Sequence, residues 1–309
     1  MTQNHHTPIS TGAARNASSV NTPLGDLDSA ITENRNRLAV AKRAVDFRLT
    51  LTTATPVTIA DVSGAANLYF TPYKGNAIAL YDGSDWEILT SAEVSKGLGG
   101  LTASANQDIF AFNNGGAVDL EFVIWSTNTA RATALALQNG IYVKSGDATR
   151  RYVGTIRTDA SSQGIDTLLF RHVWNYYNRV LRLLKRTEAT DSWAYTTAAW
   201  RYWNNSSANA VSVLRGVEED PVIFEVRGLV GGTSSGKVGL GIDSSSANSA
   251  DLLSTGATAG VRPARYQGYP GIGRRAFNLI EYGAASATFF GDNGDPGNFQ
   301  TGAVGWIWG

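Results

Sequence analysis

The amino-acid sequence predicts a mainly β protein with an extended N-terminal arm, a short trimeric coiled coil and two antiparallel β domains, the second sandwich-like or jelly-roll-like. Three observations lead to this prediction. Residues 20–45 carry a heptad pattern, and the chain after Asp46 alternates apolar and polar residues between glycine-rich turns. Only 17% of the residues are charged, whereas 33 are glycine. Many strands without intervening helices are typical of sandwiches and jelly rolls.

Residues 1–19 form the first predicted segment. They are polar and small, and they contain too little apolar surface to fold alone. Two interpretations remain open: a disordered tail, or an extended anchoring arm that becomes ordered on another protein.

Residues 20–45 form the predicted coiled-coil helix. At alternating spacings of four and three, apolar side chains occupy the core positions of the heptad, with one polar residue among them. The predicted trimer seam consists of Val20, Leu24, Leu27, Ile31, Asn34, Leu38, Ala41 and Val45. An isolated helix of this length is marginal in water, so the stripe needs partners. The helix either packs on its own domain or joins a parallel oligomer, most simply a homotrimer, and the length of the pattern favours the oligomer.

Residues 46–125 and 126–309 are predicted to form the two β domains. Hairpin turns are expected at Asp82-Gly83, at 113–116, at Asn139-Gly140 and at 145–147, where Asn, Asp and Gly separate strand-like runs. The segment 168–186 is leucine-rich enough to allow a helix, but its content of Val, Trp and Tyr favours strand.

Composition excludes several kinds of chemistry. The chain has no cysteine, which removes disulfides and thiolate nucleophiles. Its formal net charge is zero, so no general attraction to nucleic acid is expected. No run approaches the roughly 18 apolar residues of a membrane span, so no membrane insertion is predicted.

The segment GGTSSGK at 231–237 is the motif closest to a phosphate-binding loop. Val238 follows the lysine where a magnesium-binding hydroxyl is required, and strand-like runs lie on both sides. A P-loop leads from a strand into a helix. The pattern therefore favours a hairpin turn.

The remaining titratable groups show no catalytic arrangement. His5 and His6 lie in the arm, and His172 is expected to be a partly buried strand residue. The acidic run 218–220 precedes Pro221 and indicates a turn. The segment 292–295 departs from calcium-loop spacing and indicates a glycine-proline turn. The sequence thus predicts no enzyme, no catalytic residue, no cofactor and no metal site.

An aromatic cluster and a basic run are the remaining features. The cluster is either the core of the second domain or a partly exposed surface for sugar rings or a protein partner. The basic run is expected to be a solvated face or to pair with acidic residues of a neighbouring subunit. The candidate ligand-binding aromatics of the cluster are Trp193, Tyr195, Trp200, Tyr202 and Trp203, and the same aromatic-rich region also contains Trp174, Tyr176 and Tyr177. The basic run contains Arg171, Arg179, Arg182, Lys185 and Arg186.

Three segments resemble tailed-bacteriophage virion appendage proteins. NASSVNTPLGDLDSAI resembles the linker helix near the start of many fibre proteins. FRLTLTTATPVTIADV, followed by LYFTPYKGNAIALYDGSDWEILTSAEVS, is similar to a β module of virion proteins, and RRYVGTIRTDASSQGIDTLLFRHVWNYYNRV is similar to the segment that follows it. The resemblance runs from about residue 16 to beyond Glu225. It implies a homotrimeric structural protein on the tail or the capsid exterior, assembled without a cofactor.

Within that class, the sequence favours a tail fibre that contributes to host attachment. Residues 1–19 would dock on another virion protein, and the β domains would meet a host-surface glycan or protein. A head fibre or capsid decoration (cement) protein is the alternative. A polysaccharide depolymerase is disfavoured because the chain is short and lacks a repetitive β-helix pattern. A free carbohydrate-binding module would not need the arm.

Overall fold

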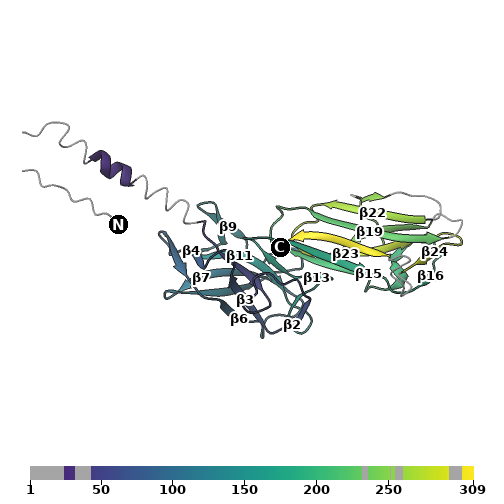
Figure 1. Cartoon of the computed structure of the whole chain (residues 1–309), viewed down its shortest axis with the longest axis horizontal. Coiled ribbons are helices and arrows are strands. Elements are labelled where there is room, and N and C mark those ends of the chain that lie inside the picture. Colours follow the sequence, from purple (N-terminus) through teal and green to yellow (C-terminus); the bar gives the residue numbers. More distant parts are fainter. Residues whose placement is uncertain (1–23, 32–42, 232–235, 251, 255–259, 292–300) are drawn as a thin grey trace, which may run out of the picture.

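The computed structural model describes residues 24–31, 43–231, 236–250, 252–254, 260–291 and 301–309. Two β-rich domains lie side by side, and the helix formed by residues 24–31 stands apart from both (Figure 1). The prediction of a mainly β chain is confirmed, since strands follow one another from Phe47 to Trp308.

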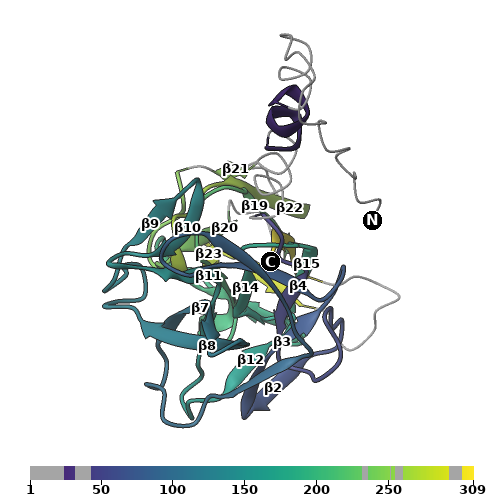
Figure 2. The ribbon, with the colours of Figure 1, turned by 90° about the vertical axis from the view of Figure 1, so that its left-hand side faces the viewer.

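The structure describes only part of the segment predicted to form a coiled coil, and it shows a single helix there. Residues 24–31 are helical, and the view along the molecule again places them outside the β domains (Figure 2). The anchoring segment 1–19 and the seam positions Val20, Asn34, Leu38 and Ala41 lie outside the described residues.

Val45 corrects the predicted end of the seam. Its side chain is only 7% exposed and lies in the core of the first domain, and its backbone forms an antiparallel bridge with Ile78. Val45, Phe47 and Leu49 are spaced two residues apart and enter the same core. The change to strand periodicity thus begins before Asp46, and the heptad cannot extend through Val45.

The first domain is built from two small sheets and a larger one, which we call the β11 sheet. The small sheets have the orders β1-β3-β6 and β4-β5. Their strands are β1 (Phe47–Thr50), β3 (Asn67–Pro72), β6 (Val94–Gly97), β4 (Ala77–Tyr81) and β5 (Trp86–Thr90). The β11 sheet contains, in order, β8 (Ala117–Ile124), β7 (Asn106–Asn114), β11 (Asp147–Arg157), β10 (Ile141–Lys144) and β9 (Leu135–Gln138), with β14 (Val173–Asn175) beside β11.

Because this sheet contains strands from both sides of residue 125, the first domain does not end at the predicted residue. Strands β9, β10 and β11 continue the sheet that β7 and β8 begin, so the first domain extends to about residue 180, except for the short strands at 62–65, 164–166 and 170–171, which pair in a sheet of the second domain. The β11 sheet also serves both domains. Ile109 and Val153 enter the core of the first domain, whereas Phe110 and Tyr152 enter the core of the second.

The second domain consists of two sheets, which we call the β23 sheet and the β19 sheet. The β23 sheet contains β17 (Trp200–Tyr202), β23 (Gly273–Tyr282), β18 (Ala210–Arg215), β13 (Phe170–Arg171), β12 (Gly164–Asp166) and β2 (Val62–Ala65), with β20 (Lys237–Ile242) beside β23. The β19 sheet contains β15 (Leu181–Thr187), β25 (Gly302–Trp308), β19 (Val222–Gly231), β22 (Gly260–Gly268), β21 (Leu252–Ser254), β24 (Thr288–Phe290) and β16 (Ser192–Ala194). Described strand pairs are antiparallel except β13 with β18.

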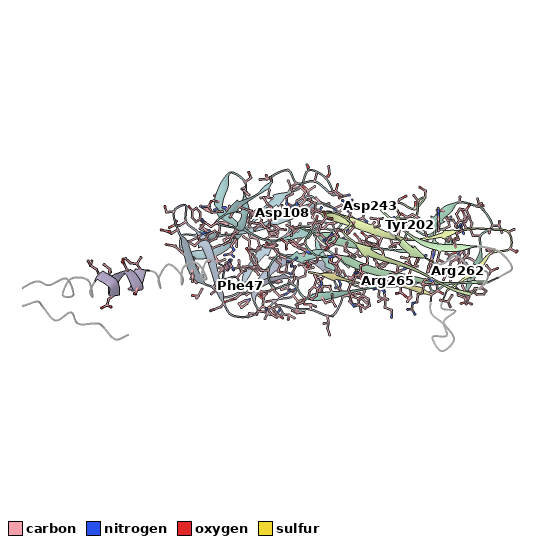
Figure 3. All side chains as sticks on the ribbon, turned by 90° about the horizontal axis from the view of Figure 1, so that it is seen from above. Phe47, Asp108, Tyr202, Asp243, Arg262 and Arg265 are labelled. Atoms are coloured by element: carbon pink, nitrogen blue, oxygen red, sulfur yellow. The ribbon has the colours of Figure 1, made fainter. Side chains whose placement is uncertain are left out.

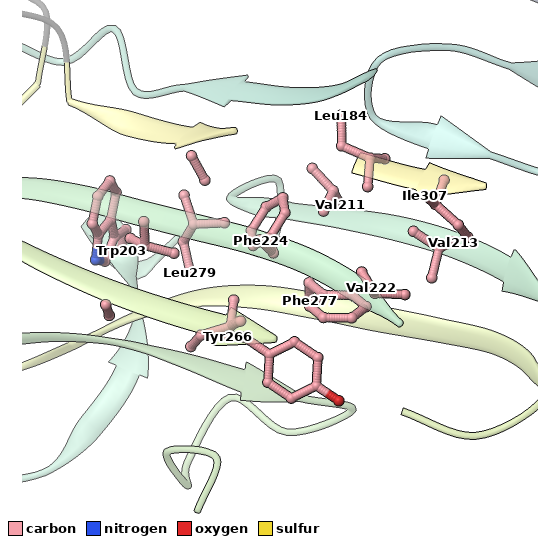
Figure 4. Packing of buried hydrophobic residues seen from close by; sticks show 14 of the residues in the cluster. Leu184, Trp203, Val211, Val213, Val222, Phe224, Tyr266, Phe277, Leu279 and Ile307 are labelled. Atoms are coloured by element: carbon pink, nitrogen blue, oxygen red, sulfur yellow. The ribbon is translucent and has the colours of Figure 1, made fainter. Parts of the chain in front are cut away.

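The two sheets enclose one apolar core, as expected for a sandwich. Val211 and Phe277 from the β23 sheet face Phe224 and Ile307 from the β19 sheet (Figure 4). Trp203, in the short 3-10 helix η1 (Trp203–Asn205), closes one end of this core, and its indole nitrogen donates to the Ile280 carbonyl at 3.0 Å.

Most predicted turns are confirmed. Asn139 and Gly140 join β9 to β10 with positive φ values of 52° and 80°, the conformation that favours Asn-Gly in two-residue hairpins. The other three turns join β4 to β5, β7 to β8 and β10 to β11. Segment 168–186 forms strands β13, β14 and β15, so the preference for strand over helix is also confirmed.

The hairpin predicted at 231–237 is wrong in one respect. Strands β19 and β20 flank the segment, but they belong to different sheets. The described strands on either side of the segment therefore lie in different layers of the second domain.

Candidate binding groove

A polar groove of about 620 Å³ lies on the outer face of the β23 sheet, where the two domains meet. Its walls come from segments far apart in the sequence. The lining residues are Asn128, Thr129, Tyr202, Ser207, Ala210, Asp243, Arg274, Arg275, Ala276 and Asn278. Tyr202 and Asp243 mark this side of the second domain in Figure 3, opposite Arg265 of the β19 sheet.

Strand alternation places polar side chains in the groove. In β23, Phe277 and Leu279 point into the sandwich core, so Arg274, Ala276 and Asn278 point outward. The register sets Ala210 of β18 opposite Asn278, which places another groove residue on the same face.

Two loops complete the walls. The Asn128 carbonyl accepts hydrogen bonds from the Arg274 backbone N–H and from Asn106 Nδ2, both at 2.8 Å, which fixes the first-domain loop against β23. On the other side, Asp243 accepts from the Ala276 backbone N–H at 2.8 Å and from Arg275 Nη1 at 2.9 Å. The groove is therefore built from rigid, hydrogen-bonded backbone.

The groove carries excess positive charge at one end. Arg274 donates through Nε to Ser212 Oγ at 2.9 Å, and the nearby Arg157 donates to the amide oxygens of Asn106 and Asn128 at 2.9 and 2.8 Å. Amide and hydroxyl oxygens accept hydrogen bonds but do not neutralise a charge. Burial, and then the charge of Arg274, lowers the pKa of Arg157 to about 10.

His172 lies behind this end of the groove. Its Nε2 is 3.0 Å from Ser212 Oγ, and the ring is buried. Burial, and then the charges of Arg157 and Arg274, lowers the pKa of His172 to about 3. The imidazole is therefore neutral at physiological pH. The prediction of a partly buried strand residue is correct as to burial, but His172 is almost fully buried and lies between strands β13 and β14.

The predicted aromatic cluster divides between core and surface. Trp203 is fully buried in the sandwich, and Trp193 stacks on Phe289 at its edge, with ring centroids 6.0 Å apart. Tyr195 lies under the Arg201 guanidinium at 3.7 Å. The half-exposed side chain of Tyr202 lines the groove.

Trp200 is the remaining member of the cluster. It is half-buried, two residues before Tyr202 on β17, and its ring meets Tyr282 edge-on at 5.4 Å. Alternation along the strand places Trp200 on the same outer face as Tyr202. Trp203 thus belongs to the core, whereas the other four side chains are half-buried, and a role for them in ligand binding stays a prediction.

The basic run is not a uniformly solvated face. Arg171 and Arg182 both contact the buried Asp166, at 3.4 and 2.7 Å. Arg179 pairs with Glu219 and Asp220, which ties the acidic turn to the end of the first domain. Packing of the two domains against each other buries these arginines and supplies carboxylates from the same chain.

Lys185 and Arg186 are the remaining residues of the basic run. Lys185 is exposed on the outer face of the β19 sheet, and Arg186 donates to Asn209 Oδ1 at 3.1 Å. Within the described residues, Arg171, Arg179 and Arg182 form ion pairs with carboxylates of the same chain, and pairing of the run with a neighbouring subunit stays a prediction. His5, His6 and the segment 292–295 lie outside the described residues.

Arg274, Asn278 and Asn128 are binding candidates that sequence reasoning missed. Polar residues at alternate positions of the strand RRAFNLIEY were the one available signal, since Arg274 and Asn278 stand four residues apart. The contribution of Asn128 comes from the docking of a distant loop, which has no local sequence signature.

The groove is suited to binding. It offers hydroxyl, amide and guanidinium groups beside aromatic rings. Among the described lining residues, Asp243 is the one carboxylate, and it is paired with Arg275. Within the described residues, no cluster of His, Asp and Glu side chains is placed to hold a metal ion. In that same part of the chain, no helix has the length and apolar content needed to cross a bilayer.

No protein-family model matches the chain, and no curated protein has a similar sequence. The resemblance to phage appendage proteins therefore stays an expectation carried by the three segments quoted for it. The case for a function rests on the groove, the helix and the exposed surfaces.

Proposed function

We propose that the protein is a homotrimeric virion structural protein of a tailed bacteriophage, most simply a tail fibre that contributes to host attachment. Residues 1–19 anchor it to another virion protein, the helix beginning near residue 20 forms a three-stranded coiled coil, and the two β domains project outward. The groove on the β23 sheet is the receptor-binding candidate.

The exposed apolar stripe of the helix is the observation that carries the proposal. Leu24, Leu27 and Ile31 are 54%, 56% and 39% exposed. Burying such side chains contributes roughly 1.5–3 kcal/mol each. A helix packed on its own domain would hide them, so their exposure supports association with other copies of the chain through the heptad positions.

A second apolar surface supports assembly. On the outer face of the β19 sheet, Leu181 is paired with Trp308, and the adjoining Leu183 is paired with Trp306. All four side chains are exposed. Contiguous exposed apolar residues mark interaction surfaces. Neighbouring subunits of a trimer would cover this one.

The groove favours attachment over capsid decoration. A protein that only clamps capsid subunits has no need for a polar groove on its β domains. Three copies of the groove in one trimer would also let modest contacts add up to firm attachment. The single, ion-paired carboxylate among the described lining residues favours binding over hydrolysis, since glycosidases use two.

Virion incorporation tests the proposal. Phage particles carrying the full chain should contain it, and particles made with a chain lacking residues 1–19 should lose it while the soluble protein stays folded. Immunogold labelling is expected at the tail tip. Label over the head would identify a decoration protein, and particles that never contain the full chain would refute virion membership.

A further inference from the structure

We propose that the groove binds an acidic sugar of a surface polysaccharide, and that Arg274 holds the sugar carboxylate. The inference names the ligand class of the proposed attachment protein and so rests on that function. Sugar binding would depend on the groove alone, and it can be measured without virions.

Arg274 presents a free binding edge to the groove. Its Nε is engaged by Ser212 Oγ at 2.9 Å, which fixes the plane of the guanidinium. Among the described residues, no side chain or carbonyl accepts from its Nη1 or Nη2. These two nitrogens match the two oxygens of a carboxylate and form parallel, charge-assisted hydrogen bonds with it.

The described residues supply no counter-charge at this position. Arg131 and Arg201 pair with Asp108 and Glu281 at 2.5 and 2.7 Å. In the described part of the chain, neither Arg157 nor Arg274 has a carboxylate within ion-pair distance. Two neighbouring guanidinium groups held only by neutral acceptors leave a net positive charge that an anionic ligand would neutralise.

The other lining groups suit the rest of a saccharide. The hydroxyls of Thr129, Ser207 and Tyr202 and the amide of Asn128 both donate and accept hydrogen bonds, as sugar hydroxyls require. Tyr202 adds an aromatic ring at the wall, and Trp200 lies on the same face. The volume of about 620 Å³ lies within the usual range of small-molecule sites.

A nucleic acid fits the chain less well. Its formal net charge is zero, whereas sequence-independent binding of a phosphate backbone needs a series of Lys and Arg contacts. The groove offers a short positive end beside hydroxyl and amide groups. This arrangement matches one carboxylate on an otherwise neutral sugar chain.

Calorimetric titration of the full-length protein tests the inference. The probes are short oligosaccharides containing glucuronate, galacturonate or sialate, each beside its neutral counterpart, together with inorganic phosphate and a single-stranded oligonucleotide. At least one acidic oligosaccharide should bind, and it should bind about tenfold or more tightly than its neutral counterpart. Arg274→Gln should weaken that binding about tenfold or more.

Two further variants keep the test independent of folding. Arg265→Gln removes an exposed arginine from the opposite sheet and should leave binding unchanged. Ser207→Trp narrows the groove from an exposed loop without altering Arg274. This variant should abolish binding of the acidic oligosaccharide. All three variants should melt within a few degrees of the wild type.

The outcomes separate the inference from the proposed function. A wild-type protein that binds none of the acidic oligosaccharides, or binds phosphate or the oligonucleotide equally well, overturns the inference. The trimeric assembly and virion incorporation would then be unaffected. Binding to a protein that proves absent from virions would leave the groove assignment intact and reject the attachment function.

Discussion

His172 illustrates how the junction of the two domains is held together by buried polar residues. The residue lies between β13, which pairs with the second domain, and β14, which pairs with β11 of the first. Its imidazole must stay neutral there, because Arg157 and Arg274 lie close by and no described carboxylate contacts the ring. Acid should therefore weaken the junction.

Stability should fall as the pH is lowered from 6.5 to about 3. The unfolded chain binds a proton at His172 near pH 6.5, whereas the folded chain does so only near pH 3. The stability contribution of the neutral ring is thus complete above pH 6.5. Between pH 6.5 and about 3, this contribution decreases by up to roughly 1.4 kcal/mol per pH unit. Urea unfolding of the wild type and His172→Gln at pH 7, 5 and 4 measures the difference, and parallel pH profiles would contradict it.

Gly216 lies tightly packed against side chains of the β11 sheet. Its carbonyl accepts from Arg131 Nη2 at 2.7 Å, and Arg131 is itself paired with Asp108 of β7. A Cβ atom at this position would lie against the Tyr152 hydroxyl and only 2.7 Å from Thr155 Oγ1 and from the Trp174 ring. No space exists for a methyl group.

Gly216→Ala should therefore destabilise the protein by about 1–3 kcal/mol, the usual cost of overpacking a buried site. The free energy of unfolding in urea measures the change. Tyr152→Phe removes the nearest atom, so the alanine should cost less in that background than in the wild type. An equal cost in both backgrounds would show that the Tyr152 hydroxyl is not the obstacle.

At the scale of elements, local patterns predicted strands and turns well. Alternating residues and Asn-Gly or Asp-Gly pairs act over a few positions, and the hairpins at Asp82-Gly83 and Asn139-Gly140 follow from them. Pairing between distant strands has no such signature. Because β7 pairs with β11, the first domain ends near residue 180, whereas the sequence predicts its end at residue 125. Likewise, the sequence predicts a hairpin after Gly231, where the flanking strands belong to different sheets.

The candidate groove escaped prediction for the same reason. Its lining combines residues from Asn128 to Asn278, which only the completed fold brings together. The aromatic cluster pointed to the correct region, but the buried Trp203 and the groove-lining Tyr202 are adjacent in the sequence. Hydrophobicity alone does not distinguish them.

Polar substitutions in the helix 24–31 should leave the β domains intact. We expect Leu24→Ser, Leu27→Ser and Ile31→Ser together to change the unfolding free energy of the β domains by less than about 0.5 kcal/mol per substitution, because the side chains are exposed. The measurement uses tryptophan fluorescence at a dilution where both proteins are monomeric. A loss of several kcal/mol would indicate that the helix packs on its own domain.

At the scale of the whole molecule, two firmly joined β domains follow a helix that contacts neither (Figure 1). Shared strands of the β11 sheet, the β13–β18 pairing and the ion pairs of Arg179 make the domains one unit. Exposed apolar side chains lie on the helix and on the outer face of the β19 sheet. A trimer would bury these two surfaces.

Sedimentation equilibrium of the full chain at micromolar concentration tests this central claim most directly. A homotrimer should sediment as a species of three times the 32.9 kDa chain mass. The variant with serine substitutions at positions 24, 27 and 31 should shift towards the mass of one chain. A wild-type protein that sediments as a single chain at these concentrations would contradict the trimer, and with it the proposed appendage.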